Sequence, residues 1–207
     1  MISWSDRTAR TLLEGYIDAK DNTRPERIAD VFADDAVLTF SLATDAIAFP
    51  ARSVGAVAIA KTLVTDFGAQ YTRCRTWYVC DELTPAGDGT LVVPWLVVMR
   101  EPATRSLRVG HGHYRWTFGE PAGDVRVTAF HIHIARMDVV ADPHGWLLDT
   151  LQGGLGYPWL TPADLRARFM DVAVREPALA FVAAFAEPAW PDASVLGSAS
   201  ASVSAAP

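Results

Sequence analysis

Two β-rich runs joined by a turn-forming segment constrain this chain more than any other feature. The runs are Leu107–Phe118 and Val125–Met137, and Gly, Glu, Pro, Ala, Gly and Asp lie between them. Runs rich in β-branched and aromatic residues around such a break predict an antiparallel hairpin. Four of the chain's 5 histidines lie in this hairpin, namely His111, His113, His131 and His133.

Side chains alternate between the two faces of a strand, so the histidines can be sorted by face. In the second run one alternate set is apolar at both ends: Val125, Val127, Ala129, His131, His133, Ala135 and Met137. Two histidines in the middle of an apolar set are typical of a buried face that opens onto a cavity. We therefore predict that His131 and His133 point inward, with Tyr114 and Trp116 of the first run beside them. His111 and His113 should then face solvent.

The inward orientation depends on the pairing register of the two strands. Tyr114 must lie beside His131, which requires the numbers of opposed residues to add up to an odd total. An even total would place His131 beside His113 and reverse the prediction, because a slip of one residue exchanges the two faces of a strand.

Length and charge limit the classes of protein to consider. The chain of 207 residues suits one domain with a sizeable core. A net charge of -6, with no basic stripe, argues against a nucleic-acid partner. The longest apolar run, Leu91–Met99, is too short to cross a bilayer, and the N-terminus lacks a signal pattern. We expect a cytoplasmic protein without a membrane partner.

The order of the remaining elements predicts the fold class. Apolar residues recur at helical spacing before residue 70, β-rich runs follow to about residue 140, and helical patterns return after that. This order indicates an α+β fold in which a curved mixed or antiparallel sheet forms a cone around the N-terminal helices. We expect the cone domain over 1–140, a helical extension packed on it over 141–190, and a disordered tail over 191–207.

Three segments resemble a known superfamily. The segments "GYIDAKDN" and "VFADDAVLTF" are similar to the helix–helix–strand entry of ketosteroid isomerase. The segment "VVPWLVVMREPATRSLRVGHGHY" resembles a hairpin of scytalone dehydratase. Both enzymes belong to the nuclear transport factor two-like superfamily, which includes the SnoaL-like cyclases. The resemblance covers about 5–140 and implies a cone around an apolar pocket, in a superfamily where many members dimerise through the outer sheet face.

The catalytic residues of the two enzymes do not carry over as sets. By resemblance, Tyr16 matches the isomerase tyrosine that donates to a substrate oxyanion, whereas the isomerase base falls on Phe40, which cannot accept a proton. Asp18 matches the dehydratase aspartate that orients a histidine, but that histidine falls on Trp95. The second isomerase donor falls near Tyr114. The resemblance therefore implies the fold and neither mechanism.

Our first hypothesis is a lyase, isomerase or cyclase that acts on an apolar cyclic substrate. His131 would transfer the proton, because a histidine titrates near neutral pH, and Tyr114 and Asp18 would assist it as the other catalytic residues. Gly112 would leave space inside the cone. The predicted ligand contacts are Tyr16, Phe40, Trp95, Gly112, Trp116 and His133.

Other hypotheses remain open beside the enzyme. The same pocket could bind a hydrophobic ligand without chemistry, or the chain could be a structural dimer. A metal site would need all four hairpin histidines on one face. We predict the two pairs on opposite faces, so we expect no metal and no cofactor. We expect a homodimer through the outer sheet face, because Phe130, Ile132 and Ile134 would otherwise form an exposed apolar patch.

Overall fold

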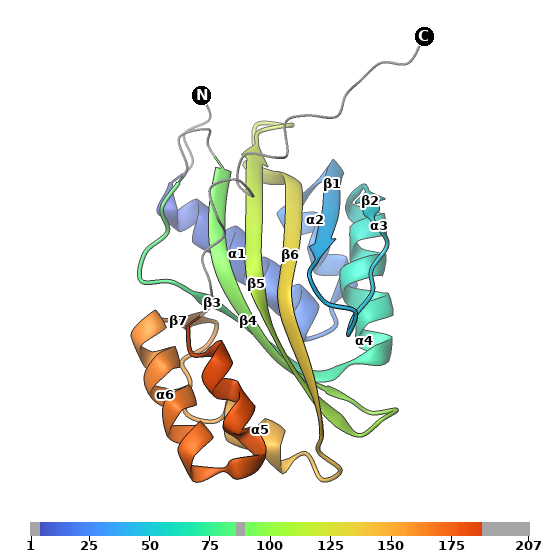
Figure 1. Cartoon of the computed structure of the whole chain (residues 1–207). Helices are drawn as coiled ribbons and strands as arrows, with labels where there is room; N and C mark the ends of the chain where they lie inside the picture. The colour runs from blue at the N-terminus through green and yellow to red at the C-terminus, as the bar shows by residue number, and fades with distance from the viewer. Residues whose placement is uncertain (1–4, 86–89, 188–207) are drawn as a thin grey trace.

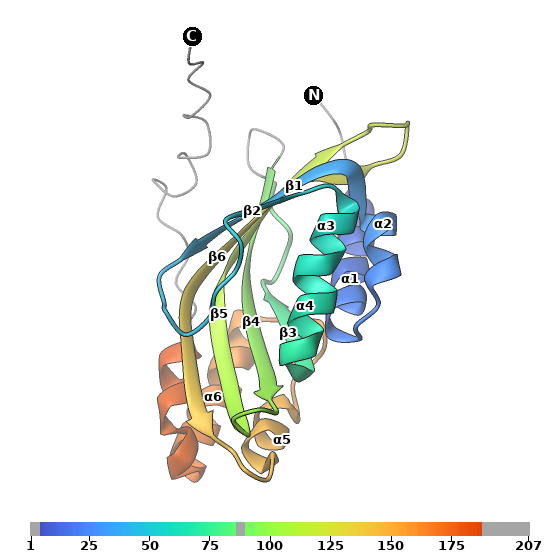
Figure 2. The same cartoon turned by 90° about the vertical axis from the view of Figure 1, so that its right-hand side faces the viewer.

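A computed structural model describes residues 5–85 and 90–187 of the chain. Helix α1 (Asp6–Asp21) begins at Ser5, whose side chain accepts a hydrogen bond from the Thr8 N–H. The other helical segments in the first 70 residues are η1 (Pro25–Arg27), α2 (Ile28–Val31), α3 (Ala56–Ala60), the π-helical η2 (Lys61–Thr65) and α4 (Asp66–Gln70). The segments α3, η2 and α4 follow one another without a break and form one rod in Figure 2.

The described strands form one seven-stranded sheet in the order β2-β1-β6-β5-β4-β3-β7. Their bounds are β1 (Phe32–Leu42), β2 (Arg52–Val54), β3 (Thr72–Val79), β4 (Thr90–Glu101), β5 (Ser106–Gly119), β6 (Arg126–Ala141) and β7 (Trp159–Leu160). The pairs β1–β6 and β3–β7 are parallel and the others antiparallel. The long strands curve around the N-terminal helices (Figure 2), so the predicted α+β cone with a mixed sheet is confirmed.

Helices cover both faces of this sheet. The N-terminal helices lie on the concave face, which we call the inner face. The segments α5 (Trp146–Gln152), α6 (Pro162–Arg175) and η3 (Pro177–Phe185) lie on the opposite, outer face (Figures 1 and 2). Two separate hydrophobic cores result, one inside the cone and one between the outer face and these C-terminal helices.

The hairpin between β5 and β6 changes its register twice. Arg136 pairs with His111 and Val127 with Phe118, so both ends have the odd total that we predicted. The register shifts between His111 and Gly112 and again between Thr117 and Phe118. Each shift places an unpaired residue in β6, as a β-bulge does. Between the two bulges the total is even.

This even register overturns the predicted orientation of the central histidines. His133 lies opposite His113, and His131 lies opposite Arg115, all on the outer face. The prediction that His131 and His133 point inward is wrong, because it assumed unbroken alternation along β6. The outward placement of His111 and His113 is correct, but both are buried rather than solvent-facing, at 7% and 3% exposure.

The expected apolar patch on the outer face is absent from the described sheet. Phe130, Ile132 and Ile134 point into the cone and are 1%, 5% and 3% exposed. The reason given for a homodimer is therefore wrong. Instead the C-terminal segments cover apolar outer-face residues of three strands, including Trp77, Leu96 and Val109.

The C-terminal extension is also joined to the sheet itself. Strand β6 ends at Ala141, and β7 of the extension then pairs in parallel with β3. Tyr157 Oη donates to Asp21 and Trp159 Nε1 donates to Glu14, which ties this loop to α1. The predicted disordered tail, 191–207, lies outside the described residues. No helix in the described ranges is both long and apolar enough to span a membrane.

Candidate functional site

A pocket lies inside the cone between α1, the α3–α4 rod and the sheet. Its walls are almost entirely apolar and include Phe40, Phe49, Phe67, Trp95, Ile132 and Met137. Tyr16, Lys20 and Tyr114 contribute its polar groups. The free volume is about 30 Å³, because side chains fill most of the cone.

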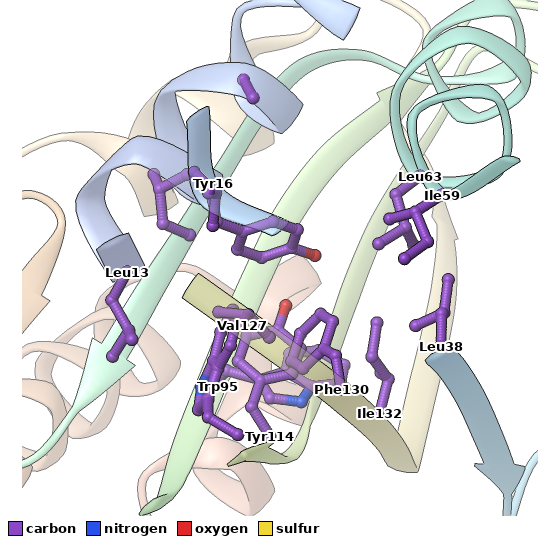
Figure 3. Close-up of a cluster of buried hydrophobic side chains, with 14 of the residues drawn as sticks. Leu13, Tyr16, Leu38, Ile59, Leu63, Trp95, Tyr114, Val127, Phe130 and Ile132 are labelled. Atoms are coloured by element: carbon purple, nitrogen blue, oxygen red, sulfur yellow. The ribbon is translucent and has the colours of Figure 1, made fainter. Parts of the chain in front are cut away.

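Aromatic rings pack against one another inside the cone. The Tyr16 ring meets those of Tyr114, Trp116 and Phe130 edge-on, with centroid distances of 5.8, 5.3 and 5.2 Å. Figure 3 shows Tyr16 reaching from α1 towards Tyr114 and Phe130. Trp116 stacks on Phe130 at 3.9 Å and is fully buried behind the pocket wall. Trp116 is therefore placed as a core residue.

Three buried donors inside the cone make no hydrogen bond of normal geometry among the described residues. They are the Tyr16 hydroxyl and the indole Nε1–H groups of Trp95 and Trp116. The Tyr114 hydroxyl still interacts with that of Tyr16 and acts to lower the pKa of Tyr16. Burial raises the pKa of Tyr16, so its hydroxyl keeps its proton. An unpaired buried hydroxyl costs free energy unless a partner arrives, which marks this end of the pocket as a place for an acceptor atom.

Lys20 forms a buried polar cluster at the pocket wall. Its Nζ donates to Asp21 Oδ1 at 3.0 Å, Thr76 Oγ1 at 2.8 Å and Cys74 Sγ at 3.2 Å. Burial acts to lower the pKa of Lys20, but the Asp21 carboxylate, with Cys74 and Tyr16, raises it above the usual value. The ammonium stays charged with its three N–H groups in use. Sequence reasoning missed this residue, although its position four residues after Tyr16 places both on one helix face.

The predicted site residues separate into three places. Tyr16, Phe40, Trp95 and Tyr114 line the pocket. Asp18 lies on the opposite side of α1 and pairs with Arg24 at 3.1 Å. His131 and His133 lie on the outer face, so the proposed catalytic set of His131, Tyr114 and Asp18 is not brought together.

Gly112 does not open space inside the cone as expected. A Cβ added at Gly112 would lie 1.9 Å from the His133 carbonyl oxygen and 3.0 Å from the Trp95 ring. The missing side chain allows β5 and β6 to approach closely, and the pocket gains nothing from it.

A second polar cluster lies on the outer face, across β1, β6 and β5. Thr39 Oγ1 is 2.8 Å from His131 Nδ1, and Ser41 Oγ is 2.9 Å from His131 Nε2 and 2.8 Å from His133 Nδ1. The His113 ring stacks on the His133 ring at 4.7 Å. Across the described ranges, no three His, Cys, Asp or Glu side chains are grouped so as to hold a metal ion.

Burial lowers the pKa values of these three histidines, and neighbouring charges lower those of His113 and His131 further. Burial is the main cause for each of them, and His113 is lowered to about 4. The charge of His133 acts on both neighbours, and Arg115 acts on His131. The imidazoles are therefore neutral near pH 7 and able to accept protons.

The chain matches no protein-family model and no curated protein sequence. Solved structures do match. The structure of LinA aligns with a TM-score of 0.54 and 12% identity over 65% of this chain and 88% of that one. A type 2 hexachlorocyclohexane dehydrochlorinase aligns with a TM-score of 0.52 and 12% identity over the same shares.

A nuclear transport factor 2-like superfamily protein from Salmonella enterica serovar Typhimurium aligns with a TM-score of 0.52 and 11% identity. The alignment covers 73% of this chain and 96% of that one. At such low identity the likeness concerns the fold. Together with the curved sheet and the helices inside it, it shows that the chain has the nuclear transport factor two-like fold.

Proposed function

We propose that this protein binds a small, neutral and mostly apolar molecule inside the cone. The Tyr16 hydroxyl would donate a hydrogen bond to one carbonyl or hydroxyl oxygen of that ligand. The observation that carries the proposal is the buried Tyr16 hydroxyl, which is set among apolar walls, makes no hydrogen bond of normal geometry among the described residues and has the Tyr114 hydroxyl as a polar neighbour. Pockets for small molecules combine such walls with a few polar groups that fix the orientation of the ligand.

The charge of the ligand follows from Lys20. Its three N–H groups already bind Asp21, Thr76 and Cys74, and the ammonium lies 4.6 Å from the centre of the Phe67 ring. A ligand carboxylate would find a charge already neutralised by Asp21, and it would also have to leave water. A neutral ligand is therefore favoured over an anion.

The same lining favours binding over proton-transfer chemistry. The titratable residues in the pocket wall are Tyr16, Lys20 and Tyr114, and the pKa of each is raised. All three carry their protons near neutral pH, so they can donate a proton or a hydrogen bond but cannot act as a base. The enzyme hypothesis needed His131 in this pocket, and His131 lies on the other side of the sheet.

Entry of a ligand requires side chains to move. A free volume of about 30 Å³ corresponds to about one water molecule. Phe40 and Phe49 stack at 4.5 Å, are partly exposed and line the pocket, so they separate it from solvent. Phe49 belongs to the loop between β1 and β2, and displacement of its ring would enlarge the cavity.

Paired ligands that differ by one carbonyl oxygen test this proposal. We expect 1-indanone to bind the native protein more tightly than indane in calorimetric titrations. In Tyr16→Phe the affinity for 1-indanone should fall about tenfold, because one hydrogen bond is lost. The affinity for indane should not fall, since the ring is retained.

Tyr157→Phe is the matched control, because it removes a tyrosine hydroxyl that binds Asp21 outside the pocket wall. Both affinities should stay as in the native protein. Equal losses of indane and 1-indanone in Tyr16→Phe would contradict the role of the hydroxyl. Failure of larger and smaller ketone–hydrocarbon pairs to bind at all would contradict the pocket itself.

A further inference from the structure

The outer-face cluster contains a serine held between two imidazoles. Ser41 lies near the end of β1, and its parallel pairing with His133 aligns the two strands so that both His131 and His133 reach Ser41 Oγ. Ser41, His131 and His133 are partly exposed, whereas His113 behind them is 3% exposed. The rear of the cluster is thus buried, and its front is accessible to solvent.

The hydroxyl proton of Ser41 can point to only one of the two imidazoles. When it points to His131 Nε2, the other ring nitrogen, Nδ1, carries a hydrogen and donates it to Thr39 Oγ1. Ser41 Oγ then accepts a hydrogen bond from His133 Nδ1–H. In this arrangement His131 is placed as a base, and the contact with Thr39 holds the orientation of its ring.

We propose that Ser41 is the nucleophile of a second site, on the outer face, which hydrolyses small activated esters with His131 as its general base. The separation of 2.9 Å between Ser41 Oγ and His131 Nε2 is within the reach expected for a nucleophile and its base. This site is independent of ligand binding inside the cone.

The reaction needs only the ester and water. Ser41 Oγ attacks the acyl carbon while its proton moves to His131 Nε2, and the leaving alcohol or phenol takes that proton as its bond to the acyl carbon breaks. Water then attacks the acyl-serine, gives one proton to His131, and releases the acid as Ser41 regains its hydrogen. His133 Nδ1–H, 2.8 Å from Ser41 Oγ, is a ring donor beside the reacting oxygen and would stabilise negative charge that develops there.

The electrostatics of the cluster keep His131 in the neutral form that a general base requires. Burial is the main cause that lowers the pKa of His131, and His133 on β6 and Arg115 on β5 lower it further. His113 on β5 and Thr39 on β1 complete the surroundings of the two rings. His131 is therefore unprotonated near pH 7.

The alternative is that these side chains only tie β1 to β6. Covalent labelling separates the two cases. We expect a fluorophosphonate at neutral pH to give one adduct by intact mass, which peptide mapping places on Ser41. Ser41→Ala should give no such adduct, and it should lose turnover of p-nitrophenyl acetate. Ser53→Ala removes another serine hydroxyl, which binds Thr62, and it should react like the native chain.

His131→Gln keeps a polar side chain at the site but removes the base, so labelling should slow about 100-fold. Thr39→Val should shift the pH profile of labelling, and Thr39→Ser should restore it, as expected for a positioning residue. Circular dichroism establishes that each variant is folded. An unlabelled Ser41 in the folded native chain, or equal labelling rates in native protein and folded His131→Gln, would overturn the proposal.

Discussion

At the scale of single residues, Gly112 shows how closely the hairpin strands approach each other. The position that its Cβ would take is 1.9 Å from the carbonyl oxygen of His133, which belongs to the neighbouring backbone. A backbone atom cannot yield as the end of a flexible side chain can. The first bulge of the hairpin lies beside this glycine, between His111 and Gly112. This bulge begins the stretch of even register in which His133 points outward.

We expect Gly112→Ala to lower the free energy of unfolding by about 3 kcal/mol or more, because overpacking usually costs about 1–3 kcal/mol and here the backbone must move. Urea denaturation measures this loss. Gly156→Ala is the control, since its Cβ would meet the Trp159 carbonyl oxygen at an ordinary 3.4 Å, and it should cost less than about 1 kcal/mol. Similar costs for the two variants would show that the close approach at Gly112 does not strain the alanine.

At the scale of elements, helix α6 joins the C-terminal extension to the outer face of the sheet. Leu165, Phe169 and Val172 follow helical spacing and are buried in the second core. Thr161 caps the helix by accepting a hydrogen bond from the Asp164 N–H, and Pro162 suits its first turn. The extension thereby covers apolar sheet residues that would otherwise face water.

Neighbouring residues of α6 give a direct measure of this packing. Phe169→Ala should lower the free energy of unfolding by about 3–5 kcal/mol, because the ring is 0% exposed and leaves a cavity. Met170→Ala should cost less than about 1 kcal/mol, because Met170 is 45% exposed. Equal and small losses in urea denaturation would mean that the extension contributes little to the stability of the sheet.

At the scale of the whole molecule, the histidines make stability depend on pH. The pKa values of His111, His113, His131 and His133 are all lowered in the folded chain, mainly by burial. Below about pH 6.5 the unfolded chain therefore binds more protons than the folded chain. The free energy of unfolding has its full value above that pH. It declines as the pH falls towards 4, which is about the pKa of His113 in the folded chain.

The free energy of unfolding should consequently be lower near pH 5 than near pH 7, and His113 alone should account for about 2 kcal/mol of the difference. His113→Gln should reduce the difference by that amount in urea denaturation at the two pH values. His144→Gln, which changes an exposed residue in a turn, should leave the difference as it is. A native protein equally stable at both pH values would contradict the lowered pKa values.

The sequence alone determined the order of most elements and the α+β class, which follow from local periodicity in neighbouring residues. The cone and the inward placement of Tyr16, Phe40, Trp95 and Tyr114 were predicted from that pattern together with the resemblance to the isomerase and the dehydratase. Apolar Phe130, Ile132 and Ile134 also carried a signal, because large apolar residues there compete with the histidines for the inner face. The assumption of strict alternation along β6 hid that signal.

Only the tertiary structure decided where the histidines point and what they meet. Two bulges in β6 reverse its faces over a short central stretch, and a bulge depends on the partner strand as much as on its own residues. The contact between Ser41 and His131 joins residues 90 positions apart through the parallel pairing of β1 and β6. Such pairing depends on the whole packed sheet, and periodicity within either strand does not specify it.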